Sequence, residues 1–220
     1  MPHAGALPDW TYERRLARRG CRHVAGMDEA GRGCLAGPVV AVALVMRPGC
    51  GPGGVTDSKL LTPARRDALL PGILHAATDW GIGAADAGEI DAINILEATR
   101  QAMRRAVEAL RFPPDHLLID AVRLPGVGIQ QTSLIRGDRI SSSIAAASIV
   151  AKVVRDRLMH YYDRMFPGFG FASHKGYGTA GHLAAVCARG ASPIHRRTFR
   201  GVWDQARLDF TGGAGSPVER

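Results

Sequence analysis

An uninterrupted apolar run, VVAVALVM at residues 39–46, constrains the fold of this chain more than any other stretch. The run has the length of a strand and is rich in valine, and it lacks the polar alternation that marks a strand with one face in water. It therefore predicts a strand that is buried on both faces. Such a strand needs packing layers on both sides, which favours a layered architecture of strands and helices.

The other apolar patterns divide into short runs typical of strands and longer ones typical of helices. Strands are predicted at 22–27, 78–85 and 116–120, helices at 9–19, 62–75, 94–111, 141–165 and 180–189, and loops rich in proline or glycine at 47–56 and 167–178. Strands near the start of the chain, followed by alternation with long helices, indicate an α/β fold.

Size and composition indicate a single soluble domain. A chain of 220 residues with 46% hydrophobic residues is long enough to bury one core. No apolar stretch reaches the ~18 residues of a membrane span, and Asp9, Glu13 and several arginines stand where a signal peptide would be apolar. We expect one domain over residues 1–220, with a flexible tail at 206–220, in the cytoplasm and without a membrane partner.

The net charge indicates the kind of partner to expect, and the cysteines indicate which kinds of site are absent from the prediction. The formal net charge of +8 comes mainly from arginine, whose planar fork suits phosphate, so the expected partner is a polyanion. The four cysteines, Cys21, Cys34, Cys50 and Cys187, stand singly along the chain. Their spacing predicts neither a zinc site nor a disulfide framework.

Two of the predicted strands end in acids. Asp28 and Glu29 follow the first strand, and Asp120 closes the last. Ligand sites of α/β sheets tend to lie at strand ends, so these acids are expected to share one site. Neighbouring side chains on a strand point to opposite faces, so Asp28 and Glu29 can share it only if the chain leaves extended geometry between them. The glycine at position 31 makes such a departure easy.

Gathered carboxylates repel one another unless cations hold them together, and hard divalent ions such as Mg²⁺ and Mn²⁺ prefer oxygen ligands. Two such ions about 3.5–4 Å apart can activate water and stabilise the leaving oxygen of a displacement at phosphorus. Acids on a basic chain therefore predict a nuclease. The alternative is a basic nucleic-acid-binding protein without catalysis, in which the acids are incidental surface or capping residues.

A glycine-rich stretch at 31–36, GRGCLA, fits the dinucleotide-binding fingerprint G-x-G-x-x-G/A, which would indicate an oxidoreductase. That fingerprint has to open a helix. Here Gly37 and Pro38 follow and lead into the strand at 39–46, so the context argues against nicotinamide chemistry.

The segment GMDEAGRGCLAGPVV at 26–40 resembles the signature of the type 2 ribonucleases H, in their bacterial branch. Further stretches match in the same order: DSKLL at 57–61, NILEATRQAM at 94–103, the acid Asp120, GDRISSSIAAASIVAKVVRD at 137–156, HKGYGT at 174–179 and SPIHRRTF at 192–199. The resemblance covers about residues 8–205. It implies a ribonuclease H-like mixed β-sheet flanked by helices, with a small helical C-terminal extension.

The resemblance also implies an activity. Such a protein is an endonuclease that hydrolyses the RNA strand of RNA–DNA hybrids and cuts 5′ of ribonucleotides embedded in duplex DNA. The implied reaction uses two divalent ions, Mn²⁺ or Mg²⁺, and leaves 5′-phosphate and 3′-hydroxyl ends, in ribonucleotide removal during DNA replication and repair. A monomer is expected, and a contact with a sliding clamp is left open.

By the same likeness, the metal-binding and catalytic acids are Asp28, Glu29, Asp120 and Asp138. Asp156 is the alternative to Asp138, because it matches the position used in archaeal members. It also stands four residues after Lys152, a spacing at which helix-surface ion pairs form.

The likeness assigns the Gly31-Arg32-Gly33 loop and Tyr177 to substrate binding. The loop backbone would read the 2′-hydroxyl, and the tyrosine would contact the next nucleotide. The 2′-hydroxyl distinguishes RNA from DNA, and glycines let a backbone approach a sugar closely. The alternative for Tyr177 is a core tyrosine that anchors a glycine loop.

The remaining expectations concern cations, histidines and one departure from the family pattern. Lys59, Lys175 and Arg196 are expected to contact phosphates as exposed cations or else simply to face solvent, and His174, His182 and His195 are expected to be structural. Cys34 stands where the family commonly has proline. Loss of that proline softens the turn but removes no ligand.

Overall fold

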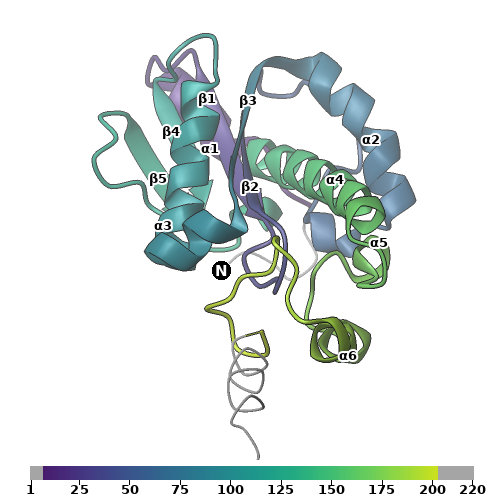
Figure 1. Ribbon diagram of the computed structural model, residues 1–220. Coiled ribbons are helices and arrows are strands. Elements are labelled where there is room, and N and C mark those ends of the chain that lie inside the picture. Colours follow the sequence, from purple (N-terminus) through teal and green to yellow (C-terminus); the bar gives the residue numbers. More distant parts are fainter. Residues whose placement is uncertain (1–6, 203–220) are drawn as a thin grey trace, which may run out of the picture.

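The computed structural model describes residues 7–202, which form a five-stranded sheet with helices on both faces (Figure 1). The strands are β1 (Val24–Ala30), β2 (Val39–Met46), β3 (Ala77–Ala85), β4 (His116–Asp120) and β5 (Gln130–Leu134). The helices are α1 (Thr11–Arg18), α2 (Pro63–Ala76), α3 (Ala87–Glu108), α4 (Ser142–Met165), α5 (Phe171–His174) and α6 (Ala180–Arg189), with the short 3₁₀ helices η1 (Ser58–Leu60) and η2 (Gly137–Arg139). The predicted α/β fold, with a small helical C-terminal extension, is confirmed.

The pairing of the strands is mixed. Their order is β3-β2-β1-β4-β5, with β1 antiparallel to β2 and parallel to β4. The outer pairs are β2 with β3, antiparallel, and β4 with β5, parallel. Met27 of β1 pairs with Ile119 of β4, so the acids that follow them, Asp28 and Asp120, lie at the same level of neighbouring strands.

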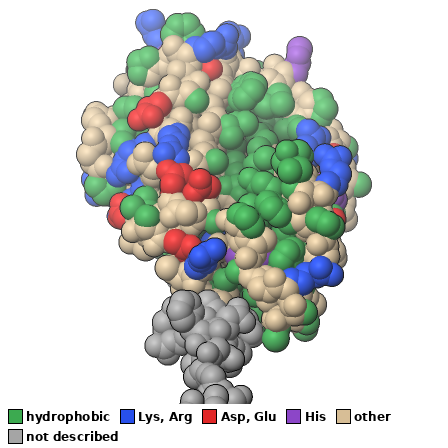
Figure 2. Space-filling model, in the orientation of Figure 1, with side chains coloured by type: hydrophobic (Ala, Val, Ile, Leu, Met, Phe, Trp, Pro, Cys, Tyr) green, Lys and Arg blue, Asp and Glu red, His purple; other side chains and the backbone are tan. Residues whose placement is uncertain are grey.

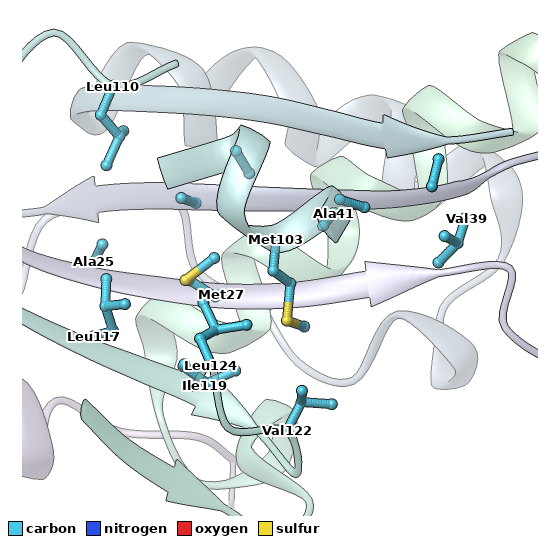
Figure 3. Close-up of a cluster of buried hydrophobic side chains, with 14 of the residues drawn as sticks. Ala25, Met27, Val39, Ala41, Met103, Leu110, Leu117, Ile119, Val122 and Leu124 are labelled. Atoms are coloured by element: carbon cyan, nitrogen blue, oxygen red, sulfur yellow. The ribbon is translucent and has the colours of Figure 1, made fainter. Parts of the chain in front are cut away.

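Strand β2 is buried along its whole length, as its apolar sequence predicts. Val39 and Val45 belong to the core beneath α3, whereas Val42 and Leu44 belong to the core that α2 and α4 cover. Figure 3 shows the first of these clusters, in which Met103 of α3 reaches toward the sheet. The central strand therefore connects two cores, one on each face of the sheet.

The N-terminal end of α4 lies directly against β1. A Cβ built on Gly26 would stand 2.3 Å from the backbone carbonyl carbon of Ser143, which is far inside contact distance. Glu13 of α1 is buried and accepts hydrogen bonds from the hydroxyls of Ser141 and Ser143 and from the Ser143 N–H. A carboxylate at this position also meets the positive end of the helix dipole. These contacts fix the start of α4, directly after η2.

Two strands differ from expectation. β1 continues as a regular paired strand through Glu29 to Ala30, so the predicted departure from extended geometry after Asp28 does not occur. The antiparallel ladder with β2 holds this segment extended. β5, with the sequence QQTSL, has no apolar alternation that predicts a strand, and it forms as an edge strand through its pairing with β4.

Helix α3 is longer than the helix predicted at 94–111. It begins at Ala87, where Asp86 and Glu89 form a reciprocal capping box. Asn94 has a φ of 67°, and its side chain accepts hydrogen bonds from N–H groups of the next turn. The helix is therefore kinked and capped a second time at the point where the prediction starts.

None of the described helices combines the length and apolar character that a membrane crossing requires. The tail predicted at 206–220 lies outside the described residues.

Gly26→Ala is expected to destabilise the protein strongly, because the new Cβ would overlap backbone atoms rather than a movable side chain. Overpacking an interior costs about 1–3 kcal/mol, and more where the backbone has to shift. Gly128→Ala is the control, since its Cβ meets no atom of residues 7–202 within 4 Å. This variant should change the free energy of unfolding by less than about 0.5 kcal/mol. Urea titration measures both values. Equal stability of the two variants would contradict the close packing of α4 on β1.

Candidate metal centre

Three acids from different parts of the chain meet at one edge of the sheet. Asp28 comes from β1, Asp120 ends β4 and Asp138 lies in η2. One carboxylate oxygen of each residue lies within 4.8 Å of the other two. Asp28 and Asp138 are buried and Asp120 is partly exposed, so solvent reaches this set, here called the acidic group, at Asp120.

The position of Asp138 depends on the turn that follows β5. The N–H of Gly137 donates to Asp120 Oδ1 at 2.7 Å, which ties η2 to the end of β4. Arg139 donates from Nε and Nη2 to Oδ2 of the buried Asp57 at 3.1 and 2.9 Å. Asp57 also caps η1. Sequence reasoning did not single out Asp57 or Arg139, although the matched DSKLL stretch contains the former.

Burial and repulsion disfavour ionisation within the acidic group. Burial raises the pKa of Asp28 well above its ordinary value, and the charges of Glu29 and Asp120 raise it further. Burial raises the pKa of Asp138 to about 6, with added repulsion from Asp57 and Asp120. A divalent cation relieves such repulsion, and a donor set made of carboxylate oxygens matches the ligand preference of Mg²⁺ and Mn²⁺. The residues present therefore fit a hard divalent ion.

Glu29 lies beside the acidic group and is not one of its three members. β1 stays extended, so the side chains of Asp28 and Glu29 leave it on opposite faces, yet the charge of Glu29 is near enough to raise the pKa of Asp28. Oε1 of Glu29 pairs with Arg32 Nη1 at 3.2 Å, and Oε2 is buried without a hydrogen-bond partner among the described residues. Burial raises the pKa of Glu29, against the opposing effect of Arg32. An unpartnered buried oxygen suits a cation ligand, and the assignment of Glu29 to the metal stays a prediction.

Lys59 lies at the rim of the acidic group. Its Nζ is 3.8 Å from Asp138 Oδ2 and 4.0 Å from Asp57 Oδ1, while its side chain is 73% exposed. Burial works against the charge of Lys59, but the surrounding carboxylates, with Asp28 the strongest, raise its pKa overall. The structure thus places a cation where a phosphate approaching the acids would meet it.

Asp156, the alternative fourth acid, lies apart from the acidic group. Its carboxylate accepts from Lys152 Nζ at 2.7 Å and from Arg66 Nη2 at 3.3 Å. The pair with Lys152 has the helix-surface spacing noted in the sequence. The chain therefore brings Asp138, and not Asp156, to Asp28 and Asp120.

The predicted substrate-binding residues of the 31–33 loop and Tyr177, here called the recognition surface, are joined by the backbone. The N–H of Leu35 donates to the carbonyl of Gly176 at 2.8 Å, which links the loop to the turn that carries Tyr177. The Tyr177 side chain is 45% exposed, and Nζ of Lys152 lies 5.7 Å from the centre of its ring. Such exposure argues against the alternative role as a core tyrosine.

The other cations expected at phosphates take different positions. Lys175 has a φ of 53°, and its ammonium turns back to the carbonyl of Ala172. Burial lowers the pKa of Lys175. Arg196 is fully buried, so the expectation of an exposed phosphate contact is wrong for this residue. Its guanidinium bonds to backbone carbonyls in the interior, a partner set that the sequence does not reveal.

A chain of neutral histidines supports the Tyr177 turn. The N–H of Ser192 donates to His195 Nδ1 at 2.9 Å, so the proton of that imidazole is on Nε2. His195 Nε2 then donates to His182 Nε2 at 2.9 Å, and His182 Nδ1 donates to the carbonyl of Tyr177 at 2.9 Å. Burial lowers the pKa of His182, and that of His195 to about 4. The histidines are structural, as predicted, but their link to Tyr177 is visible only in the fold.

A mixed sheet with helices on both faces, and acids gathered where the parallel strands β1 and β4 lie side by side, defines a hydrolase of the ribonuclease H-like class. The sequence profile of the Ribonuclease HII family matches residues 25–205. The chain therefore belongs to the ribonuclease HII family, as its motifs predict. Proteins of this family are metal-dependent hydrolases that cut the RNA of RNA–DNA hybrids.

Individual relatives agree with this assignment. The ribonuclease HII of Geobacter sulfurreducens is 58% identical over 193 residues, which cover 88% of this chain and 89% of that protein. The ribonuclease HII of Syntrophotalea carbinolica is 53% identical over 191 residues, covering 87% and 91%. The crystal structure of ribonuclease H2 from Pyrococcus horikoshii has a TM-score of 0.71 at 26% identity, over 84% of this chain and 98% of that one.

Without metal ions, ionisation of Asp138 is expected to destabilise the fold. The unfolded chain releases this proton near the ordinary pKa of 3.8, whereas the folded protein holds it until about pH 6. The contribution of Asp138 to the free energy of unfolding therefore falls as the pH rises through that window, by up to about 3 kcal/mol. Asp138→Asn removes the titration.

Urea titrations in EDTA, from about pH 4 to about pH 7, measure this effect. The stability of Asp138→Asn relative to the parent should rise with pH, and millimolar Mg²⁺ should reduce the difference by stabilising the parent. A difference that does not change with pH would contradict the argument.

Proposed function

We propose that this protein cuts on the 5′ side of single ribonucleotides embedded in duplex DNA, besides hydrolysing the RNA strand of RNA–DNA hybrids. The observation that carries the proposal is the closeness of the recognition surface to the acidic group. Arg32 of the loop pairs with Glu29 at 3.2 Å, and the N–H of Glu29 donates to Asp28 Oδ1 at 2.7 Å. A sugar bound at the loop thus brings its neighbouring phosphate toward the carboxylates. The ends produced, 5′-phosphate and 3′-hydroxyl, suit ribonucleotide removal during DNA replication and repair.

The residues proposed to hold two divalent ions, Mg²⁺ or Mn²⁺, are Asp28, Glu29, Asp120 and Asp138. When bound, the ions supply an activated water and stabilise the leaving oxygen of the displacement at phosphorus. The contribution of the chain is to hold the carboxylates in place before substrate arrives. Asp57 and Arg139 do so for Asp138 through their paired hydrogen bonds.

The surrounding basic side chains bind and orient the nucleic-acid backbone. Lys59 and Arg32 are 73% and 41% exposed, which lets each meet a phosphate. Such cations bind phosphate, which DNA and RNA share, so they cannot tell the two apart. Discrimination therefore has to come from the loop backbone and Tyr177, which face the sugar and the next nucleotide.

A basic nucleic-acid-binding protein without catalysis is the second candidate, favoured by the net charge of +8. On the face seen in Figure 2, however, basic and acidic side chains are interspersed and form no single basic patch. Buried carboxylates would also repel phosphate unless cations occupied them. Divalent-dependent cutting of duplexes with zero, one or several ribonucleotides, with the cut positions mapped, separates the two candidates.

Asp28→Asn and Asp120→Asn are each expected to lower cleavage by several orders of magnitude, because each removes a charge from the proposed metal ligands. The fold should persist, since each change also relieves repulsion within the acidic group. Asp138→Asn should show a similar loss. Asp156→Asn is the matched control, because that carboxylate is bound to Lys152 and Arg66 away from the acids. Rates on a single-ribonucleotide duplex in Mg²⁺ or Mn²⁺ test the series, and a larger loss for Asp156 than for Asp138 would reverse the assignment.

Tyr177→Ala and Arg32→Ala are expected to lower turnover of a single-ribonucleotide duplex by about a hundredfold, as loss of a positioning contact commonly does. Metal affinity, measured by calorimetry, should change little for Tyr177→Ala and should persist for Arg32→Ala, which also releases Glu29 from its ion pair. Tyr161→Ala is the control for Tyr177, since Tyr161 is 48% exposed on α4 and lies beside Arg164. If Tyr177→Ala cuts as fast as the parent, Tyr177 does not read the junction.

A further inference from the structure

Two arginines lie fully buried beneath the recognition surface. Arg155 of α4 and Arg196 of the C-terminal segment are both 0% exposed. Neither takes part in an ion pair within the described residues, and every hydrogen bond found for their guanidiniums goes to a backbone carbonyl. A buried charge is costly unless dipoles or charges compensate it. Here the carbonyls of the loop that follows β1 supply this compensation.

The two arginines bind different parts of that loop. Arg196 donates from Nη2 to the carbonyl of Gly31 at 2.7 Å and from Nη1 to the carbonyl of Arg32 at 2.8 Å, with further bonds to Gly37. The guanidinium also lies 5.1 Å from the centre of the Phe199 ring. Arg155 instead donates to the carbonyls of three residues outside the 31–33 loop: Ala36, Pro38 and Lys175.

Because the peptide group is planar, the hydrogen bonds from Arg196 to the loop carbonyls also set the direction of the N–H groups that follow them. In a trans peptide group, the C=O of one residue and the N–H of the next point in opposite directions. Two carbonyls drawn inward to Arg196 therefore turn the N–H groups of Arg32 and Gly33 outward. Neither N–H donates to an acceptor among the described residues.

The glycines of the loop agree with this division between an inner and an outer side. A Cβ on Gly31 would stand 1.9 Å from Nε of Arg155, and the φ of Gly31 is +99°, so Arg155 packs against the inner side of the loop there without bonding to the carbonyls of residues 31–33. A Cβ on Gly33 would meet no atom of the described residues within 4 Å, so they leave the outer side open there. Nothing inside the fold requires glycine at position 33, whereas a sugar that approaches the backbone closely does.

We infer that Arg196 is a positioning residue for ribonucleotide recognition: it directs the N–H groups of Arg32 and Gly33 outward as a pair of donors for the 2′-hydroxyl oxygen. The inference rests on the proposed recognition of embedded ribonucleotides. Arg196 reaches the substrate only through the loop, so its loss should affect discrimination between ribose and deoxyribose more than affinity for metal or for nucleic acid in general.

The test compares binding of two duplexes of one sequence, one with a single ribonucleotide and one entirely of DNA. Fluorescence anisotropy measures both dissociation constants in Ca²⁺, which binds carboxylates with looser geometry than Mg²⁺, and gels verify that the duplexes stay uncut. The variants are Arg196→Lys, which keeps the charge and loses the planar fork, and Arg155→Lys, the equally buried control. Thermal melting and metal calorimetry accompany each variant.

The parent is expected to bind the ribonucleotide duplex more tightly than the DNA duplex. Arg196→Lys should reduce this ratio of dissociation constants about tenfold, and Arg155→Lys should leave it unchanged. A parent without any preference would overturn the proposed recognition itself. If the parent discriminates but Arg196→Lys does so equally well, or if both lysine variants lose the preference alike, the positioning role of Arg196 is wrong.

A measurement on the parent protein covers the case in which Arg196→Lys does not fold. Amide NMR in Ca²⁺ should show fast hydrogen exchange for the Arg32 and Gly33 amides in the free protein. These amides should shift more with the ribonucleotide duplex than with the DNA duplex. Protection in the free protein, or equal shifts with both duplexes, would overturn the inference.

Discussion

The mutual repulsion of three close carboxylates, two of them buried, is the constraint on which the organisation of this site depends. Parallel pairing of β1 and β4 brings Asp28 and Asp120 to one level of the sheet, and the turn after β5 adds Asp138. Hydrogen bonds from Gly137 to Asp120 and from Arg139 to Asp57 hold this turn. Asp57 and Arg139 thereby keep Asp138 beside the other two carboxylates. This arrangement is unfavourable until a divalent ion relieves the repulsion.

The recognition surface is held by a different kind of interaction. The carbonyl of Tyr177 accepts a hydrogen bond from His182, which His195 supports, and the loop accepts hydrogen bonds from the Arg196 guanidinium through its carbonyls. These interactions do not depend on a bound cation. The two parts of the site are therefore held by different interactions: hydrogen bonds among carboxylates, backbone and cations at the acidic group, and hydrogen bonds to backbone carbonyls at the recognition surface.

Much of this arrangement can be predicted from sequence, and the failures have identifiable causes. The apolar run of β2 predicts its burial on both faces, and acids at strand ends predict where carboxylates gather. β5 has no such pattern because most of its side chains are exposed or only half-buried, and its place in the sheet rests on hydrogen bonds to β4. The extended path through Glu29 depends on the ladder with β2, which local propensity does not encode.

Arg196 is the clearest case of a residue whose burial cannot be predicted from its residue type. Arg196 stands in the polar stretch SPIHRRTF, where nothing separates it from the neighbouring Arg197. Only the fold makes Arg196 fully buried and leaves Arg197 at the surface. Its carbonyl partners lie 159 to 165 residues earlier in the chain, a separation that no local pattern spans.

That separation has a consequence for the order in which the protein acquires its properties during synthesis. A chain leaves the ribosome from its N-terminus, and contacts between distant segments form only when both have emerged. The acids of the acidic group have all been made by residue 138, whereas the bonds that orient the loop wait for residue 196. The hydrogen bonds from Arg196 to the loop are therefore among the last contacts of the described residues that synthesis allows to form.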